Sequence, residues 1–214
     1  AHGRGEAYDY LLGERTIPSA HFATQVALHT LKHAQHPVLS VNGNVVALAG
    51  DEILLLADQI KCPIEVNIFY RTPERMDALL SDLNERKQRL DLDVDILGSH
   101  PDALIPGLKG PRAKCESRGI LASDVLLVPL EDGDRCEALV AMGKTVIVID
   151  LNPLSRSAQR GTITIVDELS RCLENMLSME VNGLPTASEY RHSETLQAAL
   201  NEIVNGMKNK FSSE

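Results

Sequence analysis

Short apolar runs alternate with longer stretches of helical period along the whole chain. Six runs are rich in β-branched and aliphatic side chains and predict strands, and two of them, 125–128 and 145–149, are near-continuous apolar runs typical of parallel strands buried on both faces. The six runs cover residues 37–41, 64–69, 93–97, 125–128, 145–149 and 163–166. Strands that alternate with helices predict an α/β protein, with a three-layer, Rossmann-like and mostly parallel sheet flanked by helices.

The segments between and after these runs predict helices and one long loop. Residues 45–60 carry an apolar helical face, and residues 73–89 begin after a candidate N-cap, Thr72, with proline at the first helical position. Residues 193–211 predict an exposed amphipathic C-terminal helix. The stretch 98–111 is rich in Pro and Gly, so we expect a functional or poorly packed loop there.

We expect a single α/β domain over residues 1–214. The 43% of hydrophobic residues and 24% of charged residues are ordinary values for a globular protein and exclude disorder and fibrous architecture. The chain opens at Ala1 inside sequence of structured character, so we also expect the natural protein to extend further upstream.

Charge and composition narrow the possible partners. The chain carries 21 Lys and Arg against 30 Asp and Glu, a net charge of −9, and its basic residues do not cluster, so we expect no nucleic-acid partner. Aromatic residues make up only 3% and Trp is absent, so stacking platforms for bases or sugars are scarce. No apolar run approaches the roughly 20 residues that span a bilayer, so we expect no membrane partner.

The four cysteines lie far apart and form no C-x-x-C pair. This spacing excludes zinc-finger, ferredoxin and thioredoxin-type sites, and it favours a reduced, cytoplasmic location. The chain also lacks G-x-x-x-x-G-K-[ST], and its only G-x-G, around Arg4, has no third glycine. A Walker-type NTPase or an orthodox NAD enzyme is therefore disfavoured.

Ligands of such folds bind beyond the carboxyl ends of the strands, where polar residues follow each apolar run. Asn42-Gly43-Asn44 has two equally supported interpretations, an anion site with orienting amides or a tight turn with an Asn N-cap. The segment 150–157 is the densest polar cluster, and we favour a nucleotide site there over a capped turn.

Other polar groups are open to more than one interpretation. The acids of Glu131-Asp132-Gly133-Asp134-Arg135 suit a divalent metal, but more often complement a helix N-terminus, and Asp167-Glu168 has the same ambiguity. His29, His33 and His36 share helical spacing but lack the H-E-x-x-H pattern, so we expect no metal site. Arg4, between two glycines, suits a phosphate or carboxylate, or belongs to a solvated turn.

Several strings in colinear order resemble the archaeal 4-phosphopantoate:beta-alanine ligase family, also called phosphopantothenate synthetases. Its most specific elements here are SVNGN at 40–44, PLEDGDR at 129–135 and IDLNPLSR at 149–156. Supporting strings are HGRGEAYDYLLGE at 2–14, EVNIFYRTPER at 65–75 and ITIVDE at 163–168. The resemblance covers nearly the whole chain.

The resemblance implies an ATP-dependent ligase of coenzyme A biosynthesis. Such an enzyme joins (R)-4-phosphopantoate to beta-alanine, forms 4'-phosphopantothenate, and releases AMP and diphosphate. It also implies a homodimer. By position, the family's ATP contacts fall on Arg4, Asp150, Leu151, Asn152, Arg156, Ser157, Asp167 and Glu168. Ser157 stands where the family pattern has Thr, and Glu168 stands where it has Asn, which replaces an amide with a charge. An upstream family segment with another nucleotide-contacting Arg is absent from this sequence.

The residues suggest a mechanism that agrees with this activity. A carboxylate must first be activated, for instance by transfer to the α-phosphate of ATP, before an amine can attack it. Such chemistry needs charge stabilisation by arginines, helix N-termini and Mg²⁺. Our candidate catalytic residues are Arg4, Arg71 and Arg156, with Asn42 and Asn44 orienting the substrate. The alternatives are a nucleotide-binding α/β module with weakened or lost activity, and an oxidoreductase, which the missing glycine fingerprint disfavours.

Overall fold

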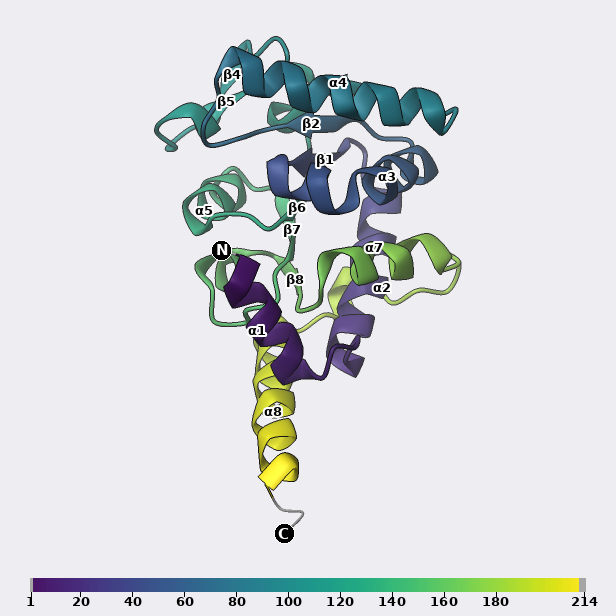
Figure 1. The fold of residues 1–214 in the computed structure, drawn as a ribbon, viewed down its shortest axis with the longest axis vertical. Coiled ribbons are helices and arrows are strands. Elements are labelled where there is room, and N and C mark those ends of the chain that lie inside the picture. Colours follow the sequence, from purple (N-terminus) through teal and green to yellow (C-terminus); the bar gives the residue numbers. More distant parts are fainter. Residues whose placement is uncertain (1, 212–214) are drawn as a thin grey trace.

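The computed structural model describes the backbone of residues 2–211 and the side chains of residues 6–208 (Figure 1). In chain order the elements are α1 (His2–Leu12), α2 (Pro18–His33), β1 (Pro37–Val41), α3 (Gly43–Ile60), β2 (Ile64–Val66), α4 (Pro73–Arg89), β3 (Ile96–Leu97), β4 (Ala103–Leu104), η1 (Pro111–Ala113), β5 (Lys114–Cys115), η2 (Ser117–Leu121), β6 (Val125–Pro129), α5 (Gly133–Ala141), β7 (Thr145–Ile149), α6 (Arg156–Arg160), β8 (Ile163–Ile165), α7 (Leu169–Ser178), η3 (Ala187–Glu189) and α8 (His192–Phe211).

Six strands form one parallel sheet in the order β3-β2-β1-β6-β7-β8, which confirms the predicted fold class. The order reverses between β1 and β6, which pair directly, with Leu39 opposite Leu127. In a parallel α/β sheet, this reversal sends the following loops of two neighbouring strands to opposite sides and opens a crevice at their carboxyl ends. The fold therefore predicts a ligand-binding site beyond the carboxyl ends of β1 and β6, at Val41 and Pro129.

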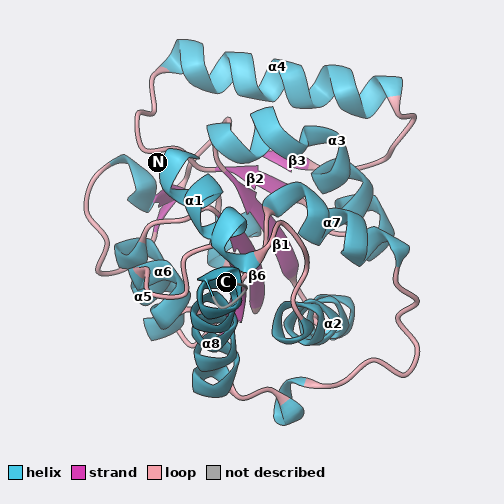
Figure 2. Ribbon diagram, turned by 60° about the horizontal axis from the view of Figure 1, so that its bottom comes forward, coloured by secondary structure: helices cyan, strands magenta, loops and turns pink. Residues whose placement is uncertain are grey.

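Alternation along the strands divides the core into two apolar clusters. Leu127, Ile147 and Ile149 pack with α2, α3 and α7, while their neighbours Leu126 and Val148 pack with α5 and η2 on the other face. Figure 2 shows the sheet between α3 and α7 on one side and α5 and α6 on the other. Burying each such side chain contributes about 1.5–3 kcal/mol, so an almost purely aliphatic core suffices here.

Helix boundaries follow the capping residues. The helix predicted over 45–60 begins at Gly43, because the Asn42 side chain accepts hydrogen bonds from the amides of Asn44 and Val45. It is kinked at Ala49, whose φ of −147° and ψ of 39° are not helical. The helix over 73–89 is confirmed, with Thr72 as its N-cap. It lies across the top of the molecule in Figure 1, outside α3.

The C-terminal helix predicted over 193–211 is α8, and it extends away from the sheet (Figure 1). It is amphipathic rather than wholly exposed, because Ala199 and Ile203 are buried while Val204 and Met207 remain exposed. Helices α1 and α2 pack against it. No helix among residues 2–211 is both long and apolar enough to cross a bilayer.

Two strand predictions were too long. The strand predicted over 64–69 ends at Val66, because the side chain of Asn67 turns to the carbonyls of Arg112 and Lys114 and the following residues leave the sheet. The strand predicted over 93–97 is only Ile96–Leu97, since it is an edge strand beside a neighbour of three residues.

The expectation of a poorly packed loop over 98–111 was also wrong. Strand β4 lies within this stretch and pairs antiparallel with β5, and Ile105 is buried. The Ile105 amide donates to the Ala113 carbonyl at 2.8 Å. Pro and Gly here mark turns of a small ordered subsheet.

Candidate active site

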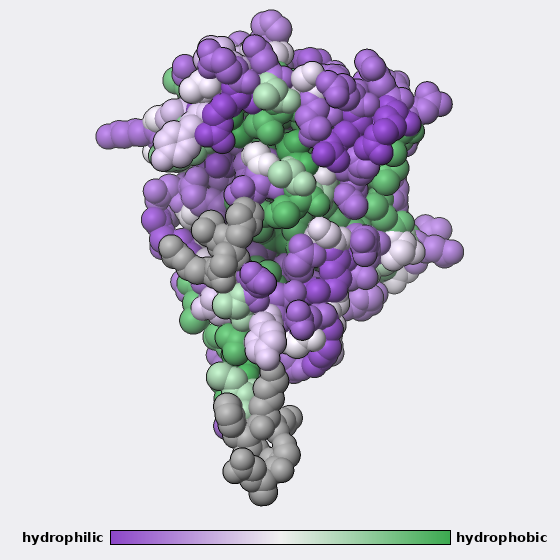
Figure 3. All heavy atoms as spheres, in the orientation of Figure 1, coloured by the Kyte–Doolittle hydropathy of each residue, from purple (hydrophilic) through white to green (hydrophobic). Residues whose placement is uncertain are grey.

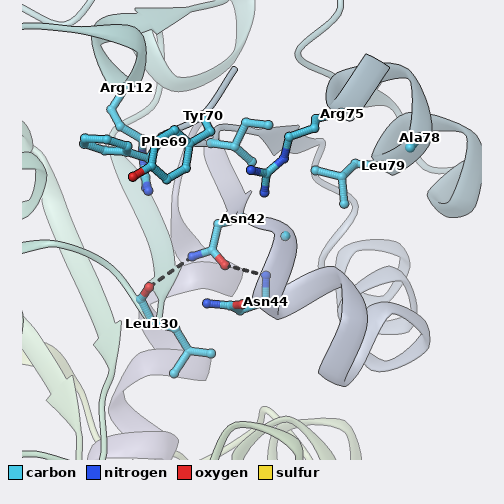
Figure 4. Close-up of a pocket in the computed structure, with 11 residues that line it drawn as sticks. Asn42, Asn44, Phe69, Tyr70, Arg75, Ala78, Leu79, Arg112 and Leu130 are labelled. Atoms are coloured by element: carbon cyan, nitrogen blue, oxygen red, sulfur yellow. Dashed lines mark hydrogen bonds between the residues drawn. The ribbon is translucent and has the colours of Figure 1, made fainter. Parts of the chain in front are cut away.

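The crevice at the switch between β1 and β6 is built around Asn42 and Leu130. The Asn42 side chain donates to the carbonyls of Pro129 at 3.3 Å and Leu130 at 3.0 Å, while its oxygen caps α3 (Figure 4). Leu130 has a left-handed φ of 51°, which is uncommon for a residue with a branched side chain. The side-chain amide of Asn42 therefore joins the loop after β1 to the loop after β6.

Two cavities adjoin at this crevice, and Asn44 and Leu130 line both of them. We call the first, of about 450 Å³, the basic cavity, because Arg75 and Arg112 line it. We call the second, of about 600 Å³, the acidic cavity, because six of its described lining residues are carboxylic acids and none is basic. These volumes are typical of small-molecule sites. Figure 3 shows the hollow on this face, with apolar atoms over α3 below the charged surface of α4.

The acidic cavity brings together most of the residues predicted as nucleotide contacts. They come from the loops after β7 and β8 and from the start of α6, and they are Asp150, Leu151, Asn152, Ser157, Asp167 and Glu168. Apolar side chains on its wall include Leu48, which is 49% exposed. The apolar side chains suit a planar base, and the polar groups around them suit the hydroxyls of its sugar.

Asp150 organises the loop after β7. One carboxylate oxygen accepts from the Asn152 amide at 2.9 Å, and the other accepts from the hydroxyls of Ser155 at 2.5 Å and Ser157 at 2.7 Å. The Ser155 hydroxyl also accepts from the Ala158 amide, and so caps α6. The loop therefore has a defined shape.

The acids after β8 are held in a similar way. Asp167 accepts from Thr16 at 2.6 Å and from the Arg171 guanidinium at 2.8 Å, and Arg171 also contacts Asp9. Burial alone would lower the pKa of Arg171, but the hydrogen bonds to Asp9 and Asp167 raise it overall. Glu168 caps α7 by accepting from the Arg171 amide at 2.9 Å.

The basic cavity lies between the N-terminus of α3, the start of α4 and the loop after β2. In Figure 4 the Arg75 guanidinium points into the space above Asn42 and Asn44. It lies 5.8 Å from the centre of the Tyr70 ring, within the range of a cation–π contact. Phe69 and Tyr70 stand edge to face at 5.0 Å and are 57% and 67% exposed, although aromatic residues are rare in this chain.

A buried ion network underlies both cavities. Glu131, which lines the acidic cavity, lies between the guanidinium groups of Arg112 and Arg135, and Arg135 also donates to the Ser40 hydroxyl at 2.8 Å. Burial lowers the pKa of Arg112, even though the charge of Glu131 opposes this effect. The network joins strands β1 and β6 to the wall between the cavities.

Two predicted arginines, Arg71 and Arg156, line neither cavity. Arg71 turns into the fold and donates to the carbonyls of Val66 and Gly98, and burial lowers its pKa. Arg156 is exposed, with Asp134 at 2.6 Å and Glu137 at 3.3 Å. The side chain of Arg4 lies outside the described residues.

Sequence reasoning missed the two arginines of the basic cavity. Arg75 stands in the string around Thr72, where it was interpreted only as part of a helix start. Arg112 follows the stretch taken for a loose loop, and no local pattern marks it. Its position depends on the pairing of β4 with β5, which brings η1 to the carboxyl end of β6.

Among residues with described side chains, no group of three or more His, Cys, Asp or Glu is placed to hold a metal ion. The rings of His29 and His33 stack at 4.1 Å between centroids, and the His33 ring contacts the His29 carbonyl. The four cysteines are unpaired and buried, and burial raises the pKa of Cys62 to about 12.

The fold and the two cavities define an α/β protein that binds small molecules at the switch point of a parallel sheet. The sequence profile of the phosphopantothenate/pantothenate synthetase family matches residues 19–210, so the chain belongs to this family. It is 47% identical over 211 residues to a 4-phosphopantoate–beta-alanine ligase of Thermococcus kodakarensis, covering 95% of this chain and 79% of the relative.

Two further relatives carry the same name. The Methanosarcina mazei protein is 45% identical over 216 residues, which cover 97% of this chain and 83% of the relative. The Thermococcus onnurineus protein is 50% identical over 179 residues, which cover 84% of this chain and 67% of the relative. The predicted ligase family is thus confirmed.

Proposed function

We propose that this chain joins (R)-4-phosphopantoate to β-alanine in an ATP-dependent reaction of coenzyme A biosynthesis, with release of AMP and diphosphate. Membership of the phosphopantothenate/pantothenate synthetase family supports this activity, as do close relatives named 4-phosphopantoate–beta-alanine ligase. ATP is the co-substrate that a ligase of this family implies.

One structural observation carries the assignment of the nucleotide site. Six residues from the loops after β7 and β8 and from the start of α6, which the resemblance marks as ATP contacts, line the same acidic cavity. The loops after the adjacent parallel strands β7 and β8 lie at one edge of the sheet, and all six residues also open onto one cavity. We therefore place ATP in the acidic cavity, with its base and ribose against Leu48, Leu151 and the acids after β7 and β8.

A cavity rich in acids can hold an anion only if those acids are compensated. Arg171 lies against Asp9 and Asp167, and Glu131 lies between Arg112 and Arg135. We propose that Arg4 and Arg156 supply the remaining positive charge. Mg²⁺ would be held mainly by the phosphates with one or two carboxylates of this cavity, and would neutralise phosphate charge there.

The proposed reaction has two steps. A carboxylate oxygen of 4-phosphopantoate attacks the α-phosphorus of ATP, the bond to the β-phosphate breaks, and diphosphate leaves with the displaced electron pair. The amine of β-alanine then attacks the acyl carbon, loses a proton, and AMP departs. Asn42 and Leu130 hold the wall where the two substrates meet, and the positive end of the α3 helix dipole favours the negative charge that develops there.

We further propose a homodimer and a cytoplasmic location. Exposed apolar residues on α1 and α8 support the dimer, namely Tyr10, Leu11, Val204 and Met207. Unpaired cysteines agree with a reducing compartment. Sedimentation velocity at several protein concentrations tests the dimer, which predicts a species of twice the chain mass.

One assay tests the activity. The protein is incubated with ATP, Mg²⁺, 4-phosphopantoate and β-alanine, and AMP and phosphopantothenate are quantified. AMP that forms with phosphopantothenate only when all substrates are present supports the ligase. Tight ATP binding without product formation would instead identify a nucleotide-binding module that lacks turnover.

A further inference from the structure

We propose that Arg171 is a positioning residue of the nucleotide site, which holds helix α1 across the acidic cavity through Asp9. Arg171 lines neither cavity, but its partners Asp9 and Asp167 both line the acidic one. The inference deepens the proposed function and rests on it, because it takes the acidic cavity as the site of ATP. It gives a role to Asp9 and Arg171, which are not among the contacts expected from the sequence.

Three groups from different parts of the chain converge on the Asp167 carboxylate. One oxygen accepts from the Nε of Arg171 and from the amide of Glu168, each at 2.8 Å, and the other accepts from the Thr16 hydroxyl at 2.6 Å. The guanidinium of Arg171 also donates to Asp9 on α1 at 2.5 Å. Asp167 therefore holds this part of the chain at two points, in the second half of α1 through Arg171 and just after α1 at Thr16.

Helix α1 has little apolar contact of its own to keep it over the cavity. It has 11 residues, two of them glycines, and isolated helices of this length are marginal in water. Leu12 is buried and Tyr8 packs against the core, but Tyr10 and Leu11 are 60% and 37% exposed. The helix crosses the front of the molecule in Figure 1 and packs against α8, whose described residues do not line the acidic cavity. The position of α1 over the cavity therefore depends on the Asp9–Arg171 pair.

The burial and charge of this pair suit such a role. The side chains of Arg171 and Asp9 are 26% and 16% exposed, so water screens their attraction less than that of a fully exposed pair. Arg171 also lies between two carboxylates. Without its charge, Asp9 and Asp167 would repel each other, and α1 would move away from the cavity wall.

Helix α1 brings several groups to the nucleotide. Glu6 and Asp9, three residues apart, line the acidic cavity, and Arg4, which the resemblance marks as an ATP contact, belongs to the same helix. The complete cavity exists only in molecules whose α1 is in place. A weaker attachment lowers the fraction of such molecules and raises the apparent dissociation constant of ATP in proportion. Bound ATP restores the position of α1, so the rate at saturating ATP should change little.

The test replaces Asp9 by Asn in the full chain, which removes the charge and keeps the size of the side chain. Asp9→Asn should raise the KM for ATP about 10-fold, and leave kcat and the KM for 4-phosphopantoate within about two-fold. Asp9→Glu keeps the charge and should restore part of the affinity. A KM for ATP that is unchanged or lower in Asp9→Asn would overturn the proposal.

Glu6→Gln is the matched control. Glu6 belongs to the same helix and lines the same cavity, but it forms no ion pair among the described side chains. Removing its negative charge near an anionic nucleotide should lower the KM for ATP. Charge alone predicts the same fall for Asp9→Asn, whereas loss of the contact with Arg171 predicts a rise. A rise of equal size in both variants would contradict the proposal.

A double-mutant cycle tests whether Asp9 acts through Arg171. Arg171→Gln should weaken ATP binding at least as much as Asp9→Asn, because it also leaves Asp167 without this partner. Adding Asp9→Asn to Arg171→Gln should change the dissociation constant of ATP less than about two-fold, since the pair is already broken. Effects that multiply in the double variant would show that the two residues act independently.

Hydrogen exchange of the α1 amides measures the attachment without any turnover. Exchange over residues 6–12 of the free protein should be about 10-fold faster in Asp9→Asn than in Glu6→Gln, and saturating ATP should slow it in both variants. Equal exchange in the two free variants would overturn the proposal, even in an active ligase.

Calorimetric titration with ATP separates this proposal from the ligase activity. ATP binding that weakens about 10-fold in Asp9→Asn supports the role of Arg171, even if no ligation is found and the proposed function fails. An active ligase in which Asp9→Asn binds ATP as tightly as wild type keeps the function and removes the role of Arg171.

Discussion

Arg156 begins the short helix α6 and lies between two carboxylates of α5. Its guanidinium is 2.6 Å from Asp134 and 3.3 Å from Glu137, and its side chain is 61% exposed. It directly precedes Ser157, which is bound to Asp150 and lines the acidic cavity, so we propose that a change of side-chain rotamer would bring it toward a nucleotide in that cavity. Exposed ion pairs contribute little to stability, so this movement meets little resistance.

We predict that Arg156→Ala lowers kcat/KM about 100-fold, because removal of one charge that stabilises the transition state has an effect of this size. Thermal unfolding should match that of wild type, since the ion pairs of Arg156 are exposed. Arg160→Ala is the matched control: it lies on the same helix, is 57% exposed and approaches Glu137 only at 3.8 Å. Wild-type turnover in Arg156→Ala would exclude Arg156 from the reaction.

Glu168 gives a second prediction for a single residue. It caps α7 and adds a negative charge to the acidic cavity, and the resemblance described above leads us to expect Asn at this position. Asn is among the best N-cap residues, so Glu168→Asn should keep the melting temperature. Removing a like charge near an anionic nucleotide should lower the KM for ATP about three-fold. An unchanged or higher KM would show that the charge of this carboxylate does not act on the bound nucleotide.

At the scale of the structural elements, the side-chain amide of Asn42 holds together the two loops at the switch point. Asn42 caps α3 and at the same time donates to the carbonyls of Pro129 and Leu130, which holds Leu130 in its left-handed conformation. The sequence left an anion site and an N-cap equally open at this position. The structure shows the cap, and the bridge to β6 could not be predicted because the two segments are 87 residues or more apart.

Asn42→Ala should lower the free energy of unfolding by about 2–3 kcal/mol, from loss of the cap and of the hydrogen bonds to β6. Asn42→Ser keeps a capping oxygen but is too short to reach Leu130, so it should lose about 1 kcal/mol. Urea denaturation measures both values. Equal stability of the two variants would show that the bridge to Leu130 contributes nothing. Both variants should lose turnover, because the wall between the cavities shifts.

At the scale of the whole molecule, the sequence predicted the features that depend on the residue types within a short segment. Buried parallel strands and capped helices follow from residue type, so the sheet and the ends of α4 were predictable. The loop after β7 was identified from its polar cluster and the loop after β8 from the resemblance, and residues of both line one cavity. Arg112 was not, because it depends on the antiparallel pairing of β4 with β5, and Arg71 was chosen although its side chain turns inward to backbone carbonyls. Long-range packing decides which of several arginines reaches the crevice.

The stability of the whole molecule should depend on pH through Glu65. This carboxylate is 1% exposed in β2 and accepts from the amides of Glu116 and Ile120. Burial, opposed by these hydrogen bonds and by the charge of Arg135, raises its pKa from 4.5 to about 6, and the carboxylate of Glu116 adds to the rise. The folded state therefore favours the protonated acid more than the unfolded state does.

The sign follows from this shift. The contribution of Glu65 to stability is complete below the unfolded pKa near 4.5 and is lost as the pH rises to about 6, a change of about 2 kcal/mol. Glu65→Gln cannot titrate, so the unfolding free energy of wild type minus that of the variant should fall by about 1.5 kcal/mol between pH 4.5 and 6.5. Other carboxylates titrate in both proteins and cancel, and the lost acceptor in the variant adds only a constant offset. A difference that does not change with pH, measured by urea denaturation across this range, would show that Glu65 keeps an ordinary pKa in the folded chain.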